Sequence, residues 1–181
     1  MLLELLNEVG IVAYSRKHQT VRITAPIPEP DAANPTIRVV EPTRPFSNIK
    51  HLREILRAAR EYVWWCDPQF SKRGLEPLAD EADAAHITEI RILSGPANAT
   101  ADATSDFKRF KAEMATAGIT AEWRVVPKDK MTWHDRFIVS KNETWNVPPI
   151  NTLYKGDYSE AGRSEARPPF DTWWQEGNPI V

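Results

Sequence analysis

Cysteine is nearly absent from this chain, because Cys66 is the single cysteine among its 181 residues. One thiol cannot build an internal disulfide framework, so the sequence excludes a disulfide-stabilised secreted domain and favours a reducing, cytoplasmic location. Long apolar runs are missing as well, and none approaches the roughly 20 residues that a membrane-spanning helix requires. Residues 1–8 lack a basic segment and carry acids among their leucines, which is not the pattern of a signal peptide.

An excess of basic residues is also missing. Lysine and arginine number 23 against 25 aspartates and glutamates, which gives a formal net charge of −2. The chain as a whole therefore does not attract nucleic acid electrostatically, and any site for an anion must be local. The 4 histidines and the cysteine are not closely spaced, so we predict neither a metal site nor a cofactor.

Glycine is scarce and proline is frequent, with 7 and 15 residues respectively. Prolines punctuate residues 25–46, where they predict a stiff linker that is interrupted by one short extended piece at 36–40. This linker predicts the domain boundary. We expect an N-terminal appendage of residues 1–46 and a main domain of residues 47–181.

The appendage combines a helical pattern with a hairpin pattern. Leucines at amphipathic spacing predict a helix within residues 1–10, and alternating residues predict strands near 11–14 and 20–23 with a basic tip between them. This arrangement resembles the end of a winged-helix unit. The interpretation that we favour is a small appendage that docks the chain into a larger assembly.

From Ser47 onward, helical and strand patterns alternate. Ser47 is a good N-cap, and an apolar stripe at helical spacing follows it to about Arg60. The wholly apolar run 62–66 is typical of a strand that is covered on both faces. The same patterns predict helices at 75–85 and 102–117, the latter ended by Gly118, strands at 89–95, 121–126, 133–140 and 152–156, and a helical turn or edge strand at 170–176.

This succession predicts an α/β domain with a mixed, mostly parallel sheet and helices on both faces. The strand at 133–140 follows the strand at 121–126 after a short turn. We therefore expect these two strands to pair antiparallel.

The strand predicted at 133–140 opens with three ionisable side chains, His134, Asp135 and Arg136. Side chains alternate between the faces of an extended strand, so His134 and Arg136 should point the same way. An imidazole beside a guanidinium can hold a phosphate, the arginine through bidentate hydrogen bonds. The alternative interpretation is a strand edge with an incidental histidine–arginine pair.

Two further features lie at predicted strand ends. The turn that begins at Asp67 follows the first buried strand, and Lys155 ends the strand at 152–156. Ligand sites in open α/β sheets gather at strand ends. We therefore predict a phosphate site that contains His134, Arg136, Lys155 and Asp67, with Lys141 assisting.

These features together resemble the phospholipase D-like superfamily. An Asp-Pro-x-Phe turn after a buried strand, an α/β succession and then His-Asp-Arg-Phe-Ile before an apolar strand carry the resemblance, over roughly residues 47–160. The superfamily motif is His-x-Lys, four residues, Asp, and then a Gly-Ser pair and an Asn. The resemblance implies a histidine nucleophile that works without a metal, and a site built from two copies in a homodimer or a duplicated chain.

The motif is degenerate here. His134 matches the histidine, but Arg136 stands at the lysine position and Lys141 at the aspartate position, and residues 156–159 lack the Ser-x-Asn donors. His134-Asp135-Arg136, followed later by Trp145, is also similar to the degenerate domain at the C-terminus of the MIT-domain family. That family is a dimeric binder of acidic lipid headgroups.

Our leading hypothesis is a domain that binds a phosphate-containing ligand without efficient hydrolysis, as a homodimer. The ligand classes are nucleic acid, nucleotide and phospholipid headgroup. One alternative is a metal-independent phosphodiesterase or nuclease in which His134 is the nucleophile of a homodimeric site. A second alternative is a non-catalytic interaction module of a larger assembly, in which His134 and Arg136 are structural and tied to Asp67.

Overall fold

The computed structural model describes residues 12–15, 20–23, 36–155 and 158–181. The chain divides into two compact units, Met1–Pro35 and Thr36–Val181. In the first unit, β1 (Val12–Ser15) and β2 (Thr20–Ile23) form an antiparallel hairpin. The predicted hairpin is thus confirmed, whereas the helix predicted within residues 1–10 lies outside the described residues.

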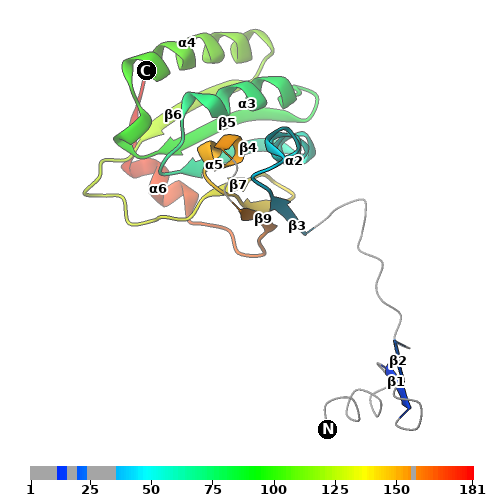
Figure 1. The fold of residues 1–181 in the computed structure, drawn as a ribbon. Coiled ribbons are helices and arrows are strands. Elements are labelled where there is room, and N and C mark those ends of the chain that lie inside the picture. Colours follow the sequence, from blue (N-terminus) through cyan, green and yellow to red (C-terminus); the bar gives the residue numbers. More distant parts are fainter. Residues whose placement is uncertain (1–11, 16–19, 24–35, 156–157) are drawn as a thin grey trace. The chain divides into compact units, whose positions relative to one another are not determined.

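An eight-stranded mixed sheet forms the centre of the second unit (Figure 1), which confirms the predicted α/β class. The order across the sheet is β10-β6-β5-β4-β7-β8-β9-β3. The strands are β3 (Ile37–Val40), β4 (Glu61–Asp67), β5 (Ile87–Ser94), β6 (Thr120–Val125), β7 (Phe137–Val139), β8 (Thr144–Asn146), β9 (Ser159–Arg163) and β10 (Asn178–Pro179).

The sheet is less parallel than the sequence predicted. Its parallel pairs are β4–β5 and β5–β6, and the other neighbouring pairs are antiparallel. The three parallel strands belong to the alternating helix–strand part of the chain, where helical crossovers return each strand in the same direction. The later strands are short, and the tight connection between β7 and β8 favours antiparallel pairing of these two.

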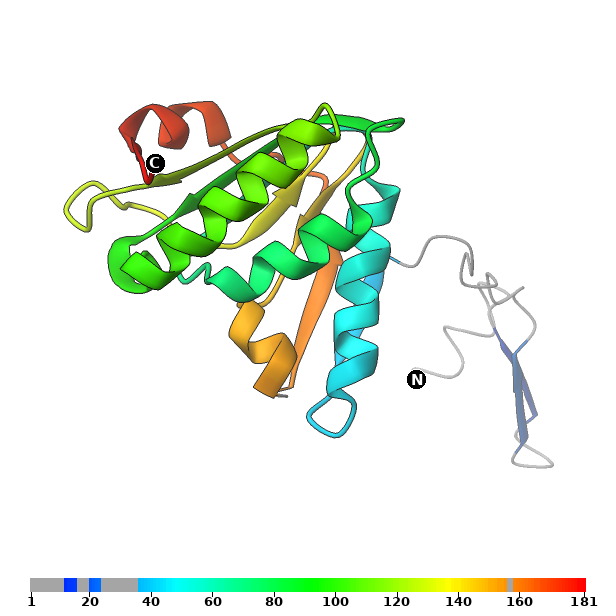
Figure 2. The ribbon, with the colours of Figure 1, turned by 90° about the horizontal axis from the view of Figure 1, so that it is seen from above.

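Helices lie on both faces of the sheet, as predicted, but unequally. Four helices cover one face, and Figure 2 shows them lying over the strands: α2 (Pro45–Ala58), α3 (Leu75–Glu81), α4 (Ala101–Thr116) and α5 (Ile150–Lys155). The larger apolar cluster fills the layer beneath these helices. On the other face, α6 (Phe170–Glu176) covers a smaller cluster that includes Cys66 of β4 and Leu93 of β5. None of the helices in the described part of the chain is long and apolar enough to cross a membrane.

The helix α4 illustrates how the local sequence sets an element. The Thr100 side chain accepts a hydrogen bond from the backbone of Ala103 at 3.2 Å and so caps the first turn. Phe107, Phe110 and Met114 recur at helical spacing and are buried. Gly118 follows the helix with a φ of +84°, a conformation that a side chain disfavours. The predicted end of the helix at Gly118 is confirmed, with Ala117 as the C-cap directly before it.

The start of the main unit was predicted too late. Residues 37–40, which the sequence placed in the linker, form β3 and pair with β9. The helix α2 then begins at Pro45 rather than after a Ser47 cap, because proline is well suited to the first turn of a helix. The compact unit therefore begins at Thr36 and not after residue 46.

The strand β7 pairs with a different partner from the one predicted. It lies antiparallel to β4, with Phe137 opposite Cys66, and not beside β6. The outer edge of β6 is occupied by β10, where Asn178 lies opposite Val125. The segment between β6 and β7 therefore carries the chain past β5 to the far side of β4.

The prediction of a strand at 152–156 was also wrong, because residues 152–155 belong to the helix α5. Ile150 and Leu153 are both buried in the main apolar cluster, and their spacing of three residues brings them to one side of a helical turn. Lys155 is consequently the last residue of a helix and does not end a strand.

Candidate functional site

The carboxyl edge of the parallel strands brings three of the predicted site residues together. The strands β4, β5 and β6 run in the same direction and end at this edge. Because β7 runs antiparallel to β4, its first residue, Phe137, lies beside Cys66. This register places Arg136 next to Asp67, although 69 positions separate the two residues in the sequence.

Asp67 is fully buried and is held by the turn that it begins. Its Oδ1 accepts a hydrogen bond from the backbone N–H of Gln69 at 2.8 Å and another from Nε of Arg136 at 3.0 Å. Its other oxygen, Oδ2, is buried and has no hydrogen-bond partner among the described residues. Burial raises the pKa of Asp67 and outweighs the contacts with Gln69 and Arg136, which favour the charged carboxylate.

Arg136 is positioned by this carboxylate and still reaches solvent, with 23% of its side chain exposed. Beyond the Asp67 contact, Nη1 donates to the carbonyl of His134 at 3.3 Å and Nη2 to Oε1 of Gln69 at 3.5 Å. A guanidinium carries more N–H donors than these contacts occupy. The Nε–H group is therefore held by Asp67. The two Nη atoms, which we call the Nη edge, have further N–H groups that can donate hydrogen bonds to an anion.

His134 is exposed and lies close to this guanidinium, because its own carbonyl accepts the Nη1 hydrogen bond. It stands in the segment before β7, which begins only at Phe137. The alternation of strand side chains therefore does not place His134 and Arg136 on one face, and that part of the sequence argument was wrong. The two residues meet through a local backbone contact instead.

The two lysines of the predicted site lie elsewhere. Lys141 follows the opposite end of β7, where its ammonium pairs with Glu61 and its backbone N–H bonds to the Arg60 carbonyl at 3.1 Å. Glu61 begins β4, whereas Asp67 ends it, so Lys141 lies at the opposite end of this strand from Asp67. Lys155 is exposed at the far end of α5, because the strand that was predicted there is a helix.

Sequence reasoning missed two residues beside Asp67. The Gln69 side chain faces Arg136, and the signal for it was its position within the predicted turn. Gly95 follows β5, and a side chain at this position would come within 2.8 Å of the Pro68 carbonyl. A glycine directly after a strand signals such a close backbone approach.

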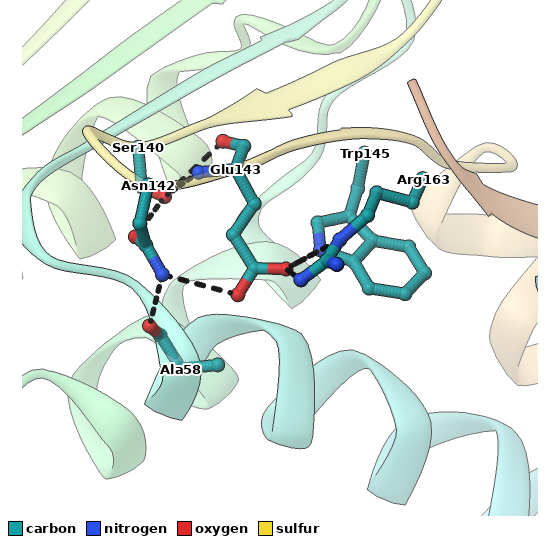
Figure 3. Close-up of polar contacts among 6 residues, drawn as sticks. All are labelled: Ala58, Ser140, Asn142, Glu143, Trp145 and Arg163. Carbon is teal, nitrogen blue, oxygen red and sulfur yellow. Dashed lines mark hydrogen bonds and ion pairs between the residues drawn. The ribbon is translucent and has the colours of Figure 1, made fainter. Parts of the chain in front are cut away.

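A second polar cluster surrounds Glu143 and lies near the start of β4, at the opposite end of this strand from Asp67 (Figure 3). The buried carboxylate accepts hydrogen bonds from Nε1 of Trp145 at 2.8 Å and from Nη2 of Arg163 at 2.7 Å. Asn142 donates to Glu143 at 3.3 Å and to the carbonyl of Ala58 at 3.2 Å. These contacts tie β8, β9 and the end of α2 together, so we interpret the cluster as structural.

The remaining candidates for chemistry are inert. No group of three or more His, Cys, Asp or Glu side chains within the described residues could hold a metal ion. Cys66 is buried, and this burial raises the pKa of its thiol to about 12. The thiol is therefore protonated at neutral pH and unsuited to act as a nucleophile.

Comparisons with known proteins leave the family open. No family model matches the sequence, and no curated protein matches it. The solved structures that are similar to this chain include two that each have 13% sequence identity to it. One is the archaeal chromatin protein TrmBL2, whose structure shows a novel mode of DNA binding; the TM-score is 0.49, with 97% of this chain and 80% of that chain covered.

The other is the polyphosphate kinase from Porphyromonas gingivalis, with a TM-score of 0.40 and coverage of 76% of this chain and 21% of that chain. Both TM-scores lie below 0.5.

Proposed function

We propose that this chain is a phospholipase D-like domain that binds a phosphate-containing ligand through Arg136 and His134, without efficient hydrolysis. The observation that carries the proposal is the orientation of Arg136, whose Nε is bound to buried Asp67 while its Nη edge remains partly exposed. A guanidinium held in this way is preorganised, so little side-chain entropy is lost when a phosphate binds.

Weak hydrolysis follows from the composition of the site. Asp67 already neutralises much of the charge of Arg136, and the predicted lysines Lys141 and Lys155 lie elsewhere. Phosphoryl transfer depends on cationic groups that stabilise charge in the transition state. A site with one partly neutralised cation is better suited to binding than to catalysis.

The test is a binding titration of the full chain with three probes: a fluorescent single-stranded oligonucleotide, a nucleoside triphosphate, and vesicles that contain phosphatidic acid. We expect at least one probe to bind, inorganic phosphate to compete, and Arg136→Ala to weaken binding by about 1.5–3 kcal/mol, the value of a charge-assisted hydrogen bond. Arg109→Ala removes an exposed arginine of α4 and is the matched control. Equal affinities of the two variants would contradict the proposal.

One observation favours the alternative in which Arg136 is structural, namely that its partner Asp67 is fully buried. In that case Arg136→Ala should lower the melting temperature and leave every affinity unchanged. Measuring melting temperature beside affinity separates the two interpretations.

Hydrolysis is tested in the same preparations with bis(p-nitrophenyl) phosphate in the presence of EDTA. Turnover that disappears in His134→Ala would replace the binding proposal by a histidine nucleophile. Turnover that survives this substitution would exclude His134 as the nucleophile.

A further inference from the structure

The strand β3 forms one edge of the sheet, and among the described residues its strand partner is β9. The backbone N–H of Arg163 donates to the carbonyl of Thr36 at 2.7 Å, so the backbone of Thr36 faces β9. Alternate residues of an antiparallel strand point their backbone groups in opposite directions. The N–H and C=O groups of Ile37 and Val39 therefore point outward, along the open edge.

An apolar strip accompanies this edge. Val40 is buried and Arg38 pairs with Glu54 of α2, so these two side chains face the helices. Ile37 and Val39 consequently face the other side of the sheet, where 57% and 53% of their surfaces are exposed. We call Ile37 and Val39 the β3 strip.

Tyr158 directly precedes β9, whose first residue, Ser159, lies opposite Val40, so it adds an exposed aromatic group near the end of the strip. It is 77% exposed. Gly162 lies opposite Ile37, and nothing would meet a side chain at that position. The helix α6 packs over β4, β5 and β7, so it leaves this part of the sheet uncovered. Contiguous exposed apolar groups of this kind mark an interaction surface.

The two edges of the sheet differ in a way that points to strand pairing at β3. The opposite edge, β10, spans two residues and contains Pro179, which lacks a backbone N–H. Short strands and prolines are common protections against edge-to-edge association. The strand β3 contains neither a proline nor a lysine, and its ladder with β9 runs without a bulge.

We propose that β3 pairs antiparallel with β3 of a second copy of this chain, so that the two sheets join across a two-fold axis. The register places Ile37 of one copy opposite Val39 of the other, because these residues carry the outward backbone groups. Glu41 cannot extend the ladder, since its N–H and carbonyl both bond to the Asn48 side chain. Arg38 lies at the axis with its charge held by Glu54 of its own copy.

The strip is complementary to itself in this register, and this identifies a second copy as the occupant. Ile37 and Val39 meet Val39 and Ile37 of the second copy. The interface does not contain His134 or Arg136, so it stands or falls independently of the proposed phosphate site.

Sedimentation of the full chain provides the first test. We expect a dimer for the natural sequence, and we expect Val39→Lys to raise the dimer dissociation constant by at least about 100-fold, because like charges would meet near the axis. Val181→Lys changes an exposed apolar residue at the other edge of the sheet and should leave the dimer intact. A monomer for the natural sequence at about 100 µM, or a dimer that Val39→Lys does not weaken, would overturn the proposal.

Disulfide trapping tests the register. The double variant Ile37→Cys/Val39→Cys should form a covalent dimer under mild oxidation, because paired residues have Cα atoms about 5.5 Å apart. Each single variant places its cysteines about 9 Å apart across the axis and should not cross-link. Native Cys66 is buried and does not interfere. Cross-linking of the single variants as fast as the double variant would refute this register.

Discussion

At the residue scale, Asp67 decides how Arg136 presents its guanidinium. The carboxylate binds Nε and is itself fixed by the Gln69 amide, so Arg136 does not sample the rotamers of a free surface arginine. The same carboxylate is buried and only half satisfied, since Oδ2 has no hydrogen-bond partner among the described residues. Such a group stays in place only when its neighbours compensate for its desolvation.

The ionisation of Asp67 gives a prediction on stability. Burial raises the pKa of Asp67 above the ordinary value of 3.8, so folding favours its protonated form. Protonated Asp67 therefore contributes fully to folding stability at a pH below its pKa in the unfolded chain. This contribution is lost as the pH rises through the pKa of Asp67 in the folded chain. The free energy of unfolding of the natural chain, relative to Asp67→Asn, should therefore fall as the pH is raised above 3.8.

Urea unfolding of both proteins over a series of pH values measures this difference, because groups common to the two cancel. A difference that grows in favour of the natural chain with rising pH would show that the Arg136 ion pair outweighs burial at Asp67.

The element scale explains why much of the fold was predictable. β4, β5, α4 and β6 carry their own periodicity, and the structure places each within a few residues of the prediction. The choice of partner strand is different, because it depends on which edges other parts of the chain already occupy. The pairing of β7 with β4 rather than β6 could not be read from local sequence for this reason.

Short elements were the second source of error. The helix α5 has 6 residues and contains β-branched and aromatic side chains, so its pattern resembles a strand. That error also affected the site, because Lys155 was included only as the end of a strand. The structure brings Asp67, His134 and Arg136 together, since Asp67 ends β4, the other two precede β7, and these strands pair with each other.

The Glu143 cluster gives a prediction for these short elements. Glu143→Ala leaves the Trp145 and Arg163 donors without their acceptor, and we expect the free energy of unfolding to fall by about 3–5 kcal/mol, the value for removing one partner of a buried ion pair. The matched control is Glu113→Ala at an exposed position of α4, which should change stability by less than about 0.5 kcal/mol. Chemical denaturation measures both, and equal effects of the two substitutions would show that the cluster does not hold β8 and β9 in place.

At the scale of the whole molecule, the sheet separates several roles by position. The carboxyl end of β4 holds the Asp67–Arg136 pair, the opposite end of this strand lies beside the Glu143 cluster, and β3 is an edge strand of the sheet among the described residues. Ligand sites at the carboxyl ends of parallel strands are the rule in α/β proteins. The parallel part of this sheet is small, but the candidate site lies where that rule predicts.

The start of the main unit is one whole-molecule feature that differs from the prediction. Prolines on both sides of residues 36–40 gave this segment the composition of a linker. Its structure is set instead by the distant strand β9, with Ile37 opposite Gly162. The amino-acid composition of a segment indicates how stiff it is. It does not indicate that the segment pairs with a strand more than a hundred residues later in the chain.

The central claim, that the Nη edge of Arg136 binds phosphate, is tested most directly by NMR of arginine side-chain N–H groups. Spectra of the full chain are recorded during titration with inorganic phosphate, and the Arg136 signal is assigned from the Arg136→Lys variant. We predict a saturable shift of the Arg136 signals that exceeds the shift of exposed Arg109. A titration in which Arg136 does not shift, or shifts no more than Arg109, would contradict the account.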